Sequence, residues 1–219
     1  MRAITVVLVF WIAAGAAAQT ASPRPPLFFR EDWKEIPPAT PVTQEHVMNP
    51  GLQLALYGPG RNGIRKSHHS SPEDDPYYVW SGSCTGNWAV ALRPRDSYVD
   101  LTGLAKIRWR TKQTGFRELH LILKLSDGAW LVSDFADGPT SDWHEREFSI
   151  ADIRWRLLDI QTIVEGPWFD HPDLSKVDEI GWTDLSVGGN TPASSRVDWI
   201  EVYGNPIPRR RLENRPASK

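Results

Sequence analysis

The side chains best suited to bind a charged ligand are basic residues in two alternating segments, 105–112 (A-K-I-R-W-R-T-K) and 118–125 (E-L-H-L-I-L-K-L). If these segments are neighbouring strands, one sheet face carries the cationic stripe Arg108, Arg110, Lys112, His120 and Lys124. Fixed cations on a sheet suit the carboxylates or sulfates of acidic polysaccharides. The alternative is a solvated face whose charges pair with Glu145, Glu147 or Asp134.

A second cluster lies in the polar segment 68–80, H-H-S-S-P-E-D-D-P-Y-Y-V-W. Its candidate ligand-binding residues are His68, His69, Tyr77, Tyr78 and Trp80, next to the acids Glu73, Asp74 and Asp75. Aromatic rings stack on the apolar faces of sugars, so this segment is interpreted as a ligand-binding lip. Two adjacent histidines are poorly spaced to ligate one metal ion. The alternative for segment 68–80 is an exposed polar loop without a ligand. Segment 166–172, G-P-W-F-D-H-P, is a similar aromatic loop around Trp168.

The elements that must position these residues are short strands. Alternating or β-branched segments bounded by turn residues are expected at 27–30, 51–57, 87–92, 105–112, 118–125, 129–134, 143–149 and 197–203. The last of these lacks strict alternation, which favours a central strand covered on both faces. One helical turn is expected within 150–158. The fold class predicted is all-β, an antiparallel two-sheet β-sandwich of jelly-roll type with little helix, and a closed barrel is the alternative.

Two core patterns stand in the last third of the chain: Leu174, Val177, Ile180 and Gly181 form Leu-x-x-Val-x-x-Ile-Gly, and Asp198, Ile200 and Val202 form Asp-x-Ile-x-Val. With these patterns, residues 99–204 resemble the galactose-binding-like jelly-roll superfamily. The chain is most similar to the branch that holds certain cellulose- and glucan-binding modules and the complex I intermediate-associated family. The resemblance implies a jelly-roll fold, and either carbohydrate binding or protein assembly as its function.

The same resemblance implies a structural calcium ion, because related jelly rolls often hold one between the opening segment and the last strand. Calcium takes hard oxygen ligands. The candidates by position are Glu31, Asp32, Asp198 and Glu201.

The N-terminus has the features of a secretory signal peptide, with Arg2 before an apolar run and an A-x-A site before Gln19. We expect cleavage after about Ala18 and a secreted or periplasmic protein with no membrane span. The expected organisation is a signal peptide (1–18), a linker (19–26), a β-sandwich domain (27–205) and a disordered basic tail (206–219).

Composition narrows the class of ligand. The formal net charge is −2 and becomes −3 without Arg2, which gives no general case for nucleic-acid binding. The single cysteine, Cys84, excludes an intrachain disulfide and is expected to be a buried small residue. Eleven tryptophans exceed what one sandwich core needs, so some are expected as exposed platforms for a polysaccharide or oligosaccharide.

The function predicted from the sequence is an exported carbohydrate-binding β-sandwich. The first alternative is a polysaccharide-active enzyme, although neither a nucleophile-elbow nor a phosphate-loop motif is present. A glycosidase would use Glu145 and Glu147, and a lyase would use His120 with Arg110 and Tyr77. The second alternative is a scaffold that assembles proteins.

Overall fold

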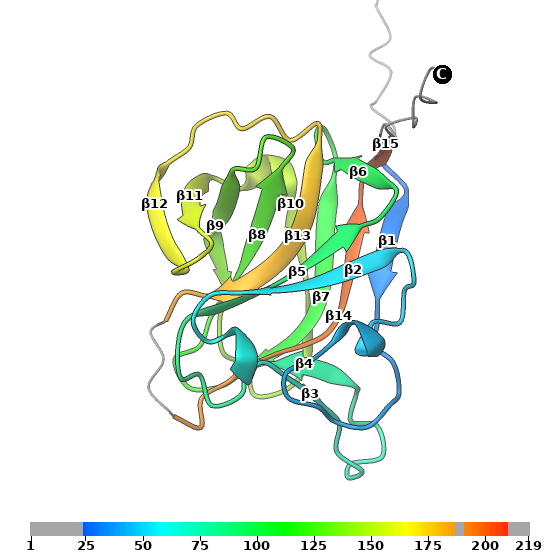
Figure 1. Ribbon diagram of the computed structural model, residues 1–219, viewed down its shortest axis with the longest axis vertical. Coiled ribbons are helices and arrows are strands. Elements are labelled where there is room, and N and C mark those ends of the chain that lie inside the picture. The colour runs from blue at the N-terminus through cyan, green and yellow to red at the C-terminus, as the bar shows by residue number, and fades with distance from the viewer. Residues whose placement is uncertain (1–23, 187–190, 210–219) are drawn as a thin grey trace, which may run out of the picture.

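The computed structural model describes residues 24–186 and 191–209, which form two antiparallel β-sheets packed face to face (Figure 1). The predicted signal peptide and most of the predicted tail lie outside the described residues. Sheet A contains β10 (His144–Ser149), β7 (Lys106–Gln113), β14 (Ser195–Tyr203), β4 (Tyr78–Trp80) and β3 (Arg65–Ser67) in that order, with β1 (Leu27–Glu31) also paired to β14. Sheet B contains β12 (Val164–Trp168), β11 (Trp155–Asp159), β9 (Trp130–Asp137), β8 (Leu119–Leu125), β13 (Val177–Asp184), β5 (Trp88–Pro94) and β2 (Leu52–Tyr57), with β6 (Ser97–Asp100) and β15 (Asn205–Pro208) at one end of β13.

The predicted all-β sandwich with little helix is confirmed by this strand pairing. The described helices are single 3-10 turns, η1 (Gln44–His46), η2 (Arg61–Gly63) and η3 (Ile150–Asp152). No helix in the described part of the chain has the length and apolarity needed to cross a membrane.

Strand β14 organises sheet A, as its apolar sequence predicts. It pairs with β7 along its length, with β1 at one end and with β4 at the other. Val197, Ile200 and Val202 point into the core and are fully buried. Its opposite side chains lie on the outer face of sheet A, so β14 joins the hydrophobic core to a polar surface.

The core between the sheets is built from alternating apolar positions and large indoles. Leu119, Leu121 and Leu123 of β8 are fully buried. His120 and Lys124 of the same strand are half-buried. Burying each leucine stabilises the fold by about 1.5–3 kcal/mol. Trp33, Trp88, Trp109 and Trp182 are also among the largest buried side chains, so much of the high tryptophan content is core. The single cysteine, Cys84, is buried as expected.

The outer face of sheet B is partly closed by a second apolar cluster. Ala89, Ala91, Ile122 and Val132 form its floor, and Ile163, which follows β11, packs onto them. At Gly181 a side-chain carbon would lie 1.9 Å from the Val90 carbonyl oxygen, so glycine is required where β13 meets β5. Among the described residues, the outer face of sheet A carries charged side chains such as Arg108, Glu145 and Glu201 and no matching apolar cluster.

Three boundaries differ from the sequence prediction. Residues 150–158 contain η3 followed by β11 rather than a helical turn alone. The aromatic segment 166–172 begins inside β12, which ends at Trp168. Residues 206–208, assigned to the disordered tail, instead complete β15 against β6, and the domain continues to Arg209, which contacts Asp178.

Candidate ligand-binding groove on sheet A

The predicted cationic stripe is divided between the two sheets, so the expectation of one shared face is wrong. Arg108, Arg110 and Lys112 lie on β7 in sheet A, whereas His120 and Lys124 lie on β8 in sheet B. Strand β7 pairs with β10 and β14, and β8 pairs with β9 and β13. The chain crosses between the sheets after β7. Alternation fixes which side chains share a strand face, but it does not distinguish a hairpin from a crossover.

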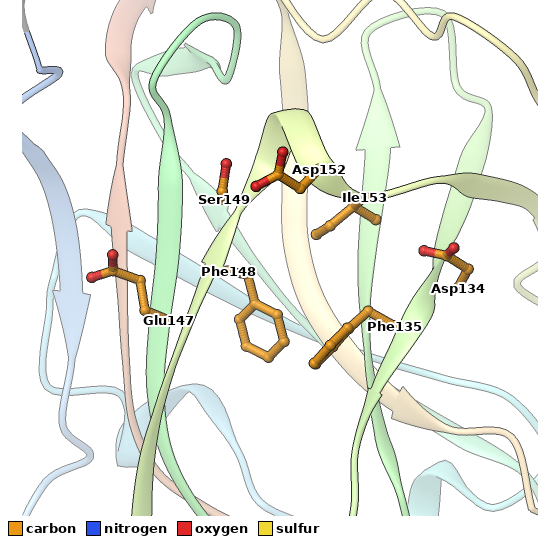
Figure 2. Close-up of a pocket in the computed structure, with 7 residues that line it drawn as sticks. All are labelled: Asp134, Phe135, Glu147, Phe148, Ser149, Asp152 and Ile153. Carbon is orange, nitrogen blue, oxygen red and sulfur yellow. The ribbon is translucent and has the colours of Figure 1, made fainter.

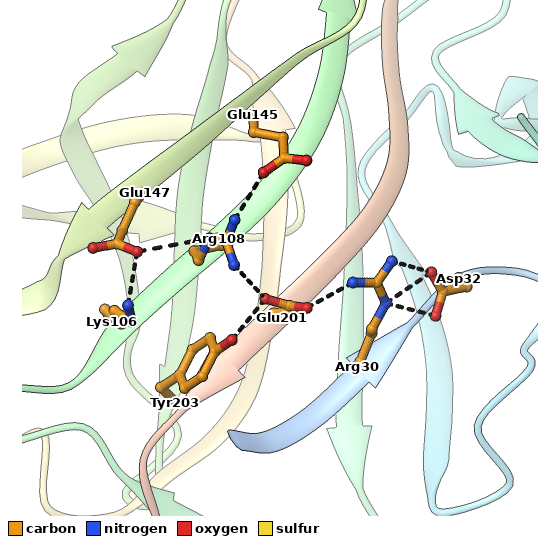
Figure 3. Close-up of polar contacts among 8 residues, drawn as sticks. All are labelled: Arg30, Asp32, Lys106, Arg108, Glu145, Glu147, Glu201 and Tyr203. Atoms are coloured by element: carbon orange, nitrogen blue, oxygen red, sulfur yellow. Dashed lines mark hydrogen bonds and ion pairs between the residues drawn. The ribbon is translucent and has the colours of Figure 1, made fainter. Parts of the chain in front are cut away.

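The cations of β7 are paired with acids of the neighbouring strands (Figure 3). Arg108 bonds Glu145 at 2.7 Å and Glu201 at 3.2 Å, and Lys106 bonds Glu147 at 2.8 Å. Further along β7, Lys112 lies 3.3 Å from Asp142. The alternative interpretation of the stripe, in which Glu145 and Glu147 neutralise it, describes this surface. It leaves few cations free to attract an acidic polysaccharide.

The two stripe residues on sheet B, Lys124 and His120, are bound to local partners. Lys124 bonds Glu179 at 2.8 Å, and the Glu179 carboxylate also accepts from the Tyr57 hydroxyl at 2.8 Å. The Nδ1 atom of His120 lies 3.0 Å from the Ser133 carbonyl oxygen. The predicted lyase arrangement of His120 with two sheet-A residues is therefore wrong. The glycosidase pair, Glu145 and Glu147, is bound to cations on an exposed strand.

A polar groove on sheet A has a volume of about 660 Å³, and we call it the sheet-A groove. It lies where β1, β7 and β14 meet the loop between β3 and β4, which hangs from the lower end of sheet A in Figure 1. Its lining residues are Arg30, Asp32, Trp33, Glu35, Met48, His68, Glu73, Asp74, Asp75, Pro76, Tyr77, Arg110, Asp198 and Trp199. The groove thus joins residues that the sequence assigned to the cationic stripe, to the aromatic lip and to a calcium site.

Two arginine–carboxylate pairs form one side of the groove. Arg110 donates to Asp198 at 2.7 Å, and Arg30 donates to Asp32 at 2.6 Å. The Arg30 guanidinium also lies over the Trp199 ring, 4.5 Å from its centroid. Burial raises the pKa of the Asp198 carboxyl above its usual range, although the Arg110 guanidinium opposes the rise. These pairs offer donors and acceptors side by side, an arrangement that matches neighbouring hydroxyl groups.

An aromatic stack forms the other side. The rings of His68 and Tyr77 lie 4.1 Å apart with an interplanar angle of 12°. The Nδ1 atom of His68 is 2.9 Å from the Asp75 carbonyl oxygen, which ties the start of the loop to its end. The side-chain carboxylate of Asp75 also accepts a hydrogen bond from the His69 backbone N–H at 2.7 Å. The loop is thereby closed onto itself and holds the two rings together.

The remaining predicted aromatic residues do not line the groove. Trp80 lies near the guanidinium groups of Arg65 and Arg196, at 5.4 and 5.8 Å from its ring centroid. Tyr78 is 2% exposed and its hydroxyl lies 3.2 Å from Nδ1 of His69. Tyr78, Trp80 and His69 are therefore held by contacts outside the groove lining.

Trp168 belongs to a different part of the surface, at the edge strand of sheet B. It is 39% exposed, and the guanidinium groups of Arg154 and Arg156 lie 4.0 and 4.1 Å from its ring centroid. A ring covered by cations offers less of its face to a sugar than a free ring does.

The carboxylates predicted to bind calcium have other partners. Glu31 accepts backbone N–H groups of Trp33, Met48 and Asn49 at 3.0, 2.6 and 2.9 Å. Glu201 accepts from Arg30, Arg108 and Tyr203, as Figure 3 shows, and Asp32 and Asp198 are paired with arginines. No group of three or more acidic, histidine or cysteine side chains within the described residues is arranged to hold a metal ion. These residues fit ion pairs better than a calcium cage, and calcium binding stays a prediction.

A smaller cavity, of about 310 Å³, opens between β9 and β10 beside η3 (Figure 2). Its apolar part consists of Phe148, the half-buried Ile153 and Phe135, which is 41% exposed. Its polar residues are Asp134, Glu147, Ser149 and Asp152. Glu147, one of the two glycosidase candidates, is the residue selected for chemistry from the sequence that lines this cavity. The sheet-A groove contains His68, Tyr77 and Arg110 from the predicted ligand-binding set and is therefore the stronger candidate.

Six groove residues were not selected by sequence analysis: Arg30, Trp33, Glu35, Met48, Pro76 and Trp199. Arg30 lies in the opening strand, and Trp199 alternates with core residues of β14 after a register shift between Val197 and Trp199. Such an irregularity is invisible in the sequence and moves Trp199 to the outer face. The one signal in the sequence for this part of the groove was Glu31-Asp32-Trp33, which follows the apolar residues of the first strand with two charged residues and an aromatic residue.

Comparisons with known proteins find similar folds at low identity. A family 11 carbohydrate-binding module of a cellulosomal cellulase of Clostridium thermocellum is 19% identical, with a TM-score of 0.44, over 78% of this chain and 97% of the module. A family 29 carbohydrate-binding module is 12% identical, with a TM-score of 0.43, over 77% of this chain and 93% of the module. An exo-β-agarase is 11% identical, with a TM-score of 0.44, over 74% of this chain and 24% of the enzyme. No protein-family model and no curated protein matches the chain.

Proposed function

We propose that this protein is exported and binds a polysaccharide segment in the sheet-A groove. The single observation that carries the proposal is the stacked His68–Tyr77 pair facing two arginine–carboxylate pairs in one groove. A sugar ring has apolar C–H faces that pack on an aromatic ring, and hydroxyls at its edge that hydrogen-bond to charged groups. A volume of about 660 Å³ lies within the range of small-ligand sites and suits a short stretch of glycan.

The charges of the groove favour an uncharged glycan over an acidic one. Both guanidinium groups, those of Arg30 and Arg110, are already bound to carboxylates. Glu73 and Asp74 also line the groove, and neither forms an ion pair with another described residue. A polyuronate would bring further negative charge next to these acids, which costs binding energy. The groove therefore supports a neutral polysaccharide, in contrast to the acidic polymer that a shared cationic stripe would attract.

The test uses the mature chain, residues 19–219, with neutral and acidic soluble polysaccharides in native affinity gels and on a size-exclusion column. We expect a neutral polymer of unchanged mass to co-elute with the protein. Tyr77→Ala should weaken binding about tenfold, because loss of an aromatic contact costs roughly 1–1.5 kcal/mol. Tyr98→Ala, outside the groove and half-buried against Arg209, is the matched control.

Three outcomes would overturn the proposal. Binding that is unchanged in Tyr77→Ala and Arg110→Leu would place the ligand elsewhere. Absence of binding to every polymer tested would remove the function itself. A shift of the polymer to lower mass would identify an enzyme. The alternative of a protein scaffold predicts capture of a protein partner with no dependence on glycan.

A further inference from the structure

The Tyr77 ring contacts the side chains of Lys66 and His68. Lys66 is the middle residue of β3, and His68 follows directly after the end of that strand. The Lys66 ammonium lies 4.1 Å from the Tyr77 ring centroid, and the His68 ring lies 4.1 Å from it as well. We call this arrangement of Lys66, Tyr77 and His68 the Tyr77 clamp. Its outer residues, Tyr77 and His68, line the sheet-A groove.

The inner member of the clamp is a buried cation with few partners. Lys66 is 1% exposed, and its ammonium donates to the Ile36 carbonyl oxygen at 3.1 Å. An ammonium has three N–H donors, and this is its one hydrogen-bond acceptor among the described residues. The negative face of the Tyr77 ring adds a cation–π contact. Charge on Lys66 and the position of the Tyr77 ring are therefore coupled.

We propose that Lys66 is a positioning residue of the sheet-A groove, whose protonated ammonium holds the Tyr77–His68 stack in place to contact the glycan. Loss of the ammonium charge removes the attraction that fixes the ring, and glycan binding weakens as a result. The inference rests on the proposed function, because it concerns how the same groove is kept ready for its ligand.

The proton of Lys66 is lost within an accessible pH range. Burial lowers the pKa of Lys66 from 10.5 to about 8, and the negative charge of Glu35 opposes the shift. The titratable groups that face the ammonium are Glu35, Tyr77 and His68.

The first experiment needs no ligand. Lysine labelled with ¹³C at Cε reports the Lys66 titration by NMR, and the ring protons of His68 report the stack. We expect the His68 signals to shift between pH 7.5 and 9.5 with the same midpoint as Lys66. Lys66→Arg, which stays charged, should show no such shift, and Lys66→Met should show the displaced ring at every pH.

The second experiment measures affinity for the neutral polysaccharide over the same pH range. Wild-type affinity should fall roughly threefold to thirtyfold, the range expected for loss of a cation–π contact. Lys66→Arg should keep its affinity and Lys66→Met should be weak and independent of pH. His68 signals that are unchanged in Lys66→Met, or equal pH dependence in all three proteins, would overturn the inference. Coupled His68 and Lys66 titrations with no glycan bound would support the clamp and refute the proposed function.

Discussion

Glu31 offers the sharpest test of how the groove is built, because its carboxylate organises the backbone at one end. The side chain is fully buried at the end of β1. Oε1 accepts the N–H groups of Trp33 and Met48, and Oε2 accepts that of Asn49. Trp33 and Met48 both line the groove. Burial raises the pKa of Glu31, and the three hydrogen bonds oppose the rise by stabilising the charged form.

The cost of substitution can be worked out from these three bonds. In Glu31→Gln the amide oxygen can replace Oε1 and keep two bonds, but the amide nitrogen then faces the Asn49 N–H donor. One buried donor is left without an acceptor, which costs about 1–3 kcal/mol, and removal of a buried charge offsets part of this loss. Glu31→Ala leaves one buried and two part-buried N–H donors without this acceptor and should cost about 3 kcal/mol. The expected order of stability is wild type, Gln, Ala.

Urea unfolding followed by tryptophan fluorescence measures these differences, since Trp33 contacts Trp182 at a centroid distance of 6.1 Å. Glu118→Ala is the control, because Glu118 is exposed and has no hydrogen bond to a described residue. A free energy of unfolding for Glu31→Ala within about 1 kcal/mol of wild type would show that the three bonds do not hold this end of the groove. A Gln variant less stable than the Ala variant would equally refute the reasoning.

Two further predictions concern the other carboxylates of the site. Asp198 has a raised pKa, so the native state keeps a proton that the unfolded chain has lost, and this group makes folding less favourable as pH rises. Arg110→Leu removes the opposing cation, and its free energy of unfolding should fall more steeply than that of wild type between about pH 4 and 7, as measured by urea unfolding; parallel pH profiles would contradict this. If Glu31, Asp32, Asp198 and Glu201 bind calcium, EDTA should lower the unfolding temperature and added calcium should restore it. An unfolding temperature that EDTA leaves unchanged would refute calcium binding at these residues.

Local patterns predicted the strands well because they reflect local physics. The leucines of β8 and the apolar residues of β7 alternate because one face of each strand is buried, and this signal survives in a single sequence. The pairing of those strands is not local. Whether the chain turns back beside β7 or crosses to sheet B depends on how whole sheets pack. Segment 114–118 (T-G-F-R-E) is a short connection with one glycine, which would suit a hairpin although the chain crosses there. The cationic stripe was divided for this reason.

The candidate site was predictable in its parts but not as a unit. Tyr77, Arg110 and Asp198 were each selected from the sequence, under separate hypotheses about sugar, acidic polymer and calcium. The groove brings them together because β14 pairs with β7 while the loop before β4 folds over their shared end. Lys66 was not selected, since a lysine in a short polar strand gives no sign that it is buried.

The ion pairs that hold Arg30 explain how the groove keeps its shape. Arg30 donates through Nε and Nη2 to Asp32 and through Nη1 to Glu201, and Glu201 in turn accepts from Arg108 and from the Tyr203 hydroxyl (Figure 3). The groove residue Arg30 is therefore fixed by Asp32 inside the groove and by Glu201 of β14, whose carboxylate Arg108 and Tyr203 hold from outside it. A guanidinium held at all three nitrogens loses little freedom when a sugar hydroxyl arrives, so less binding energy is lost to ordering the site. The network of ion pairs on sheet A thus makes the groove rigid rather than providing unpaired charges for a ligand.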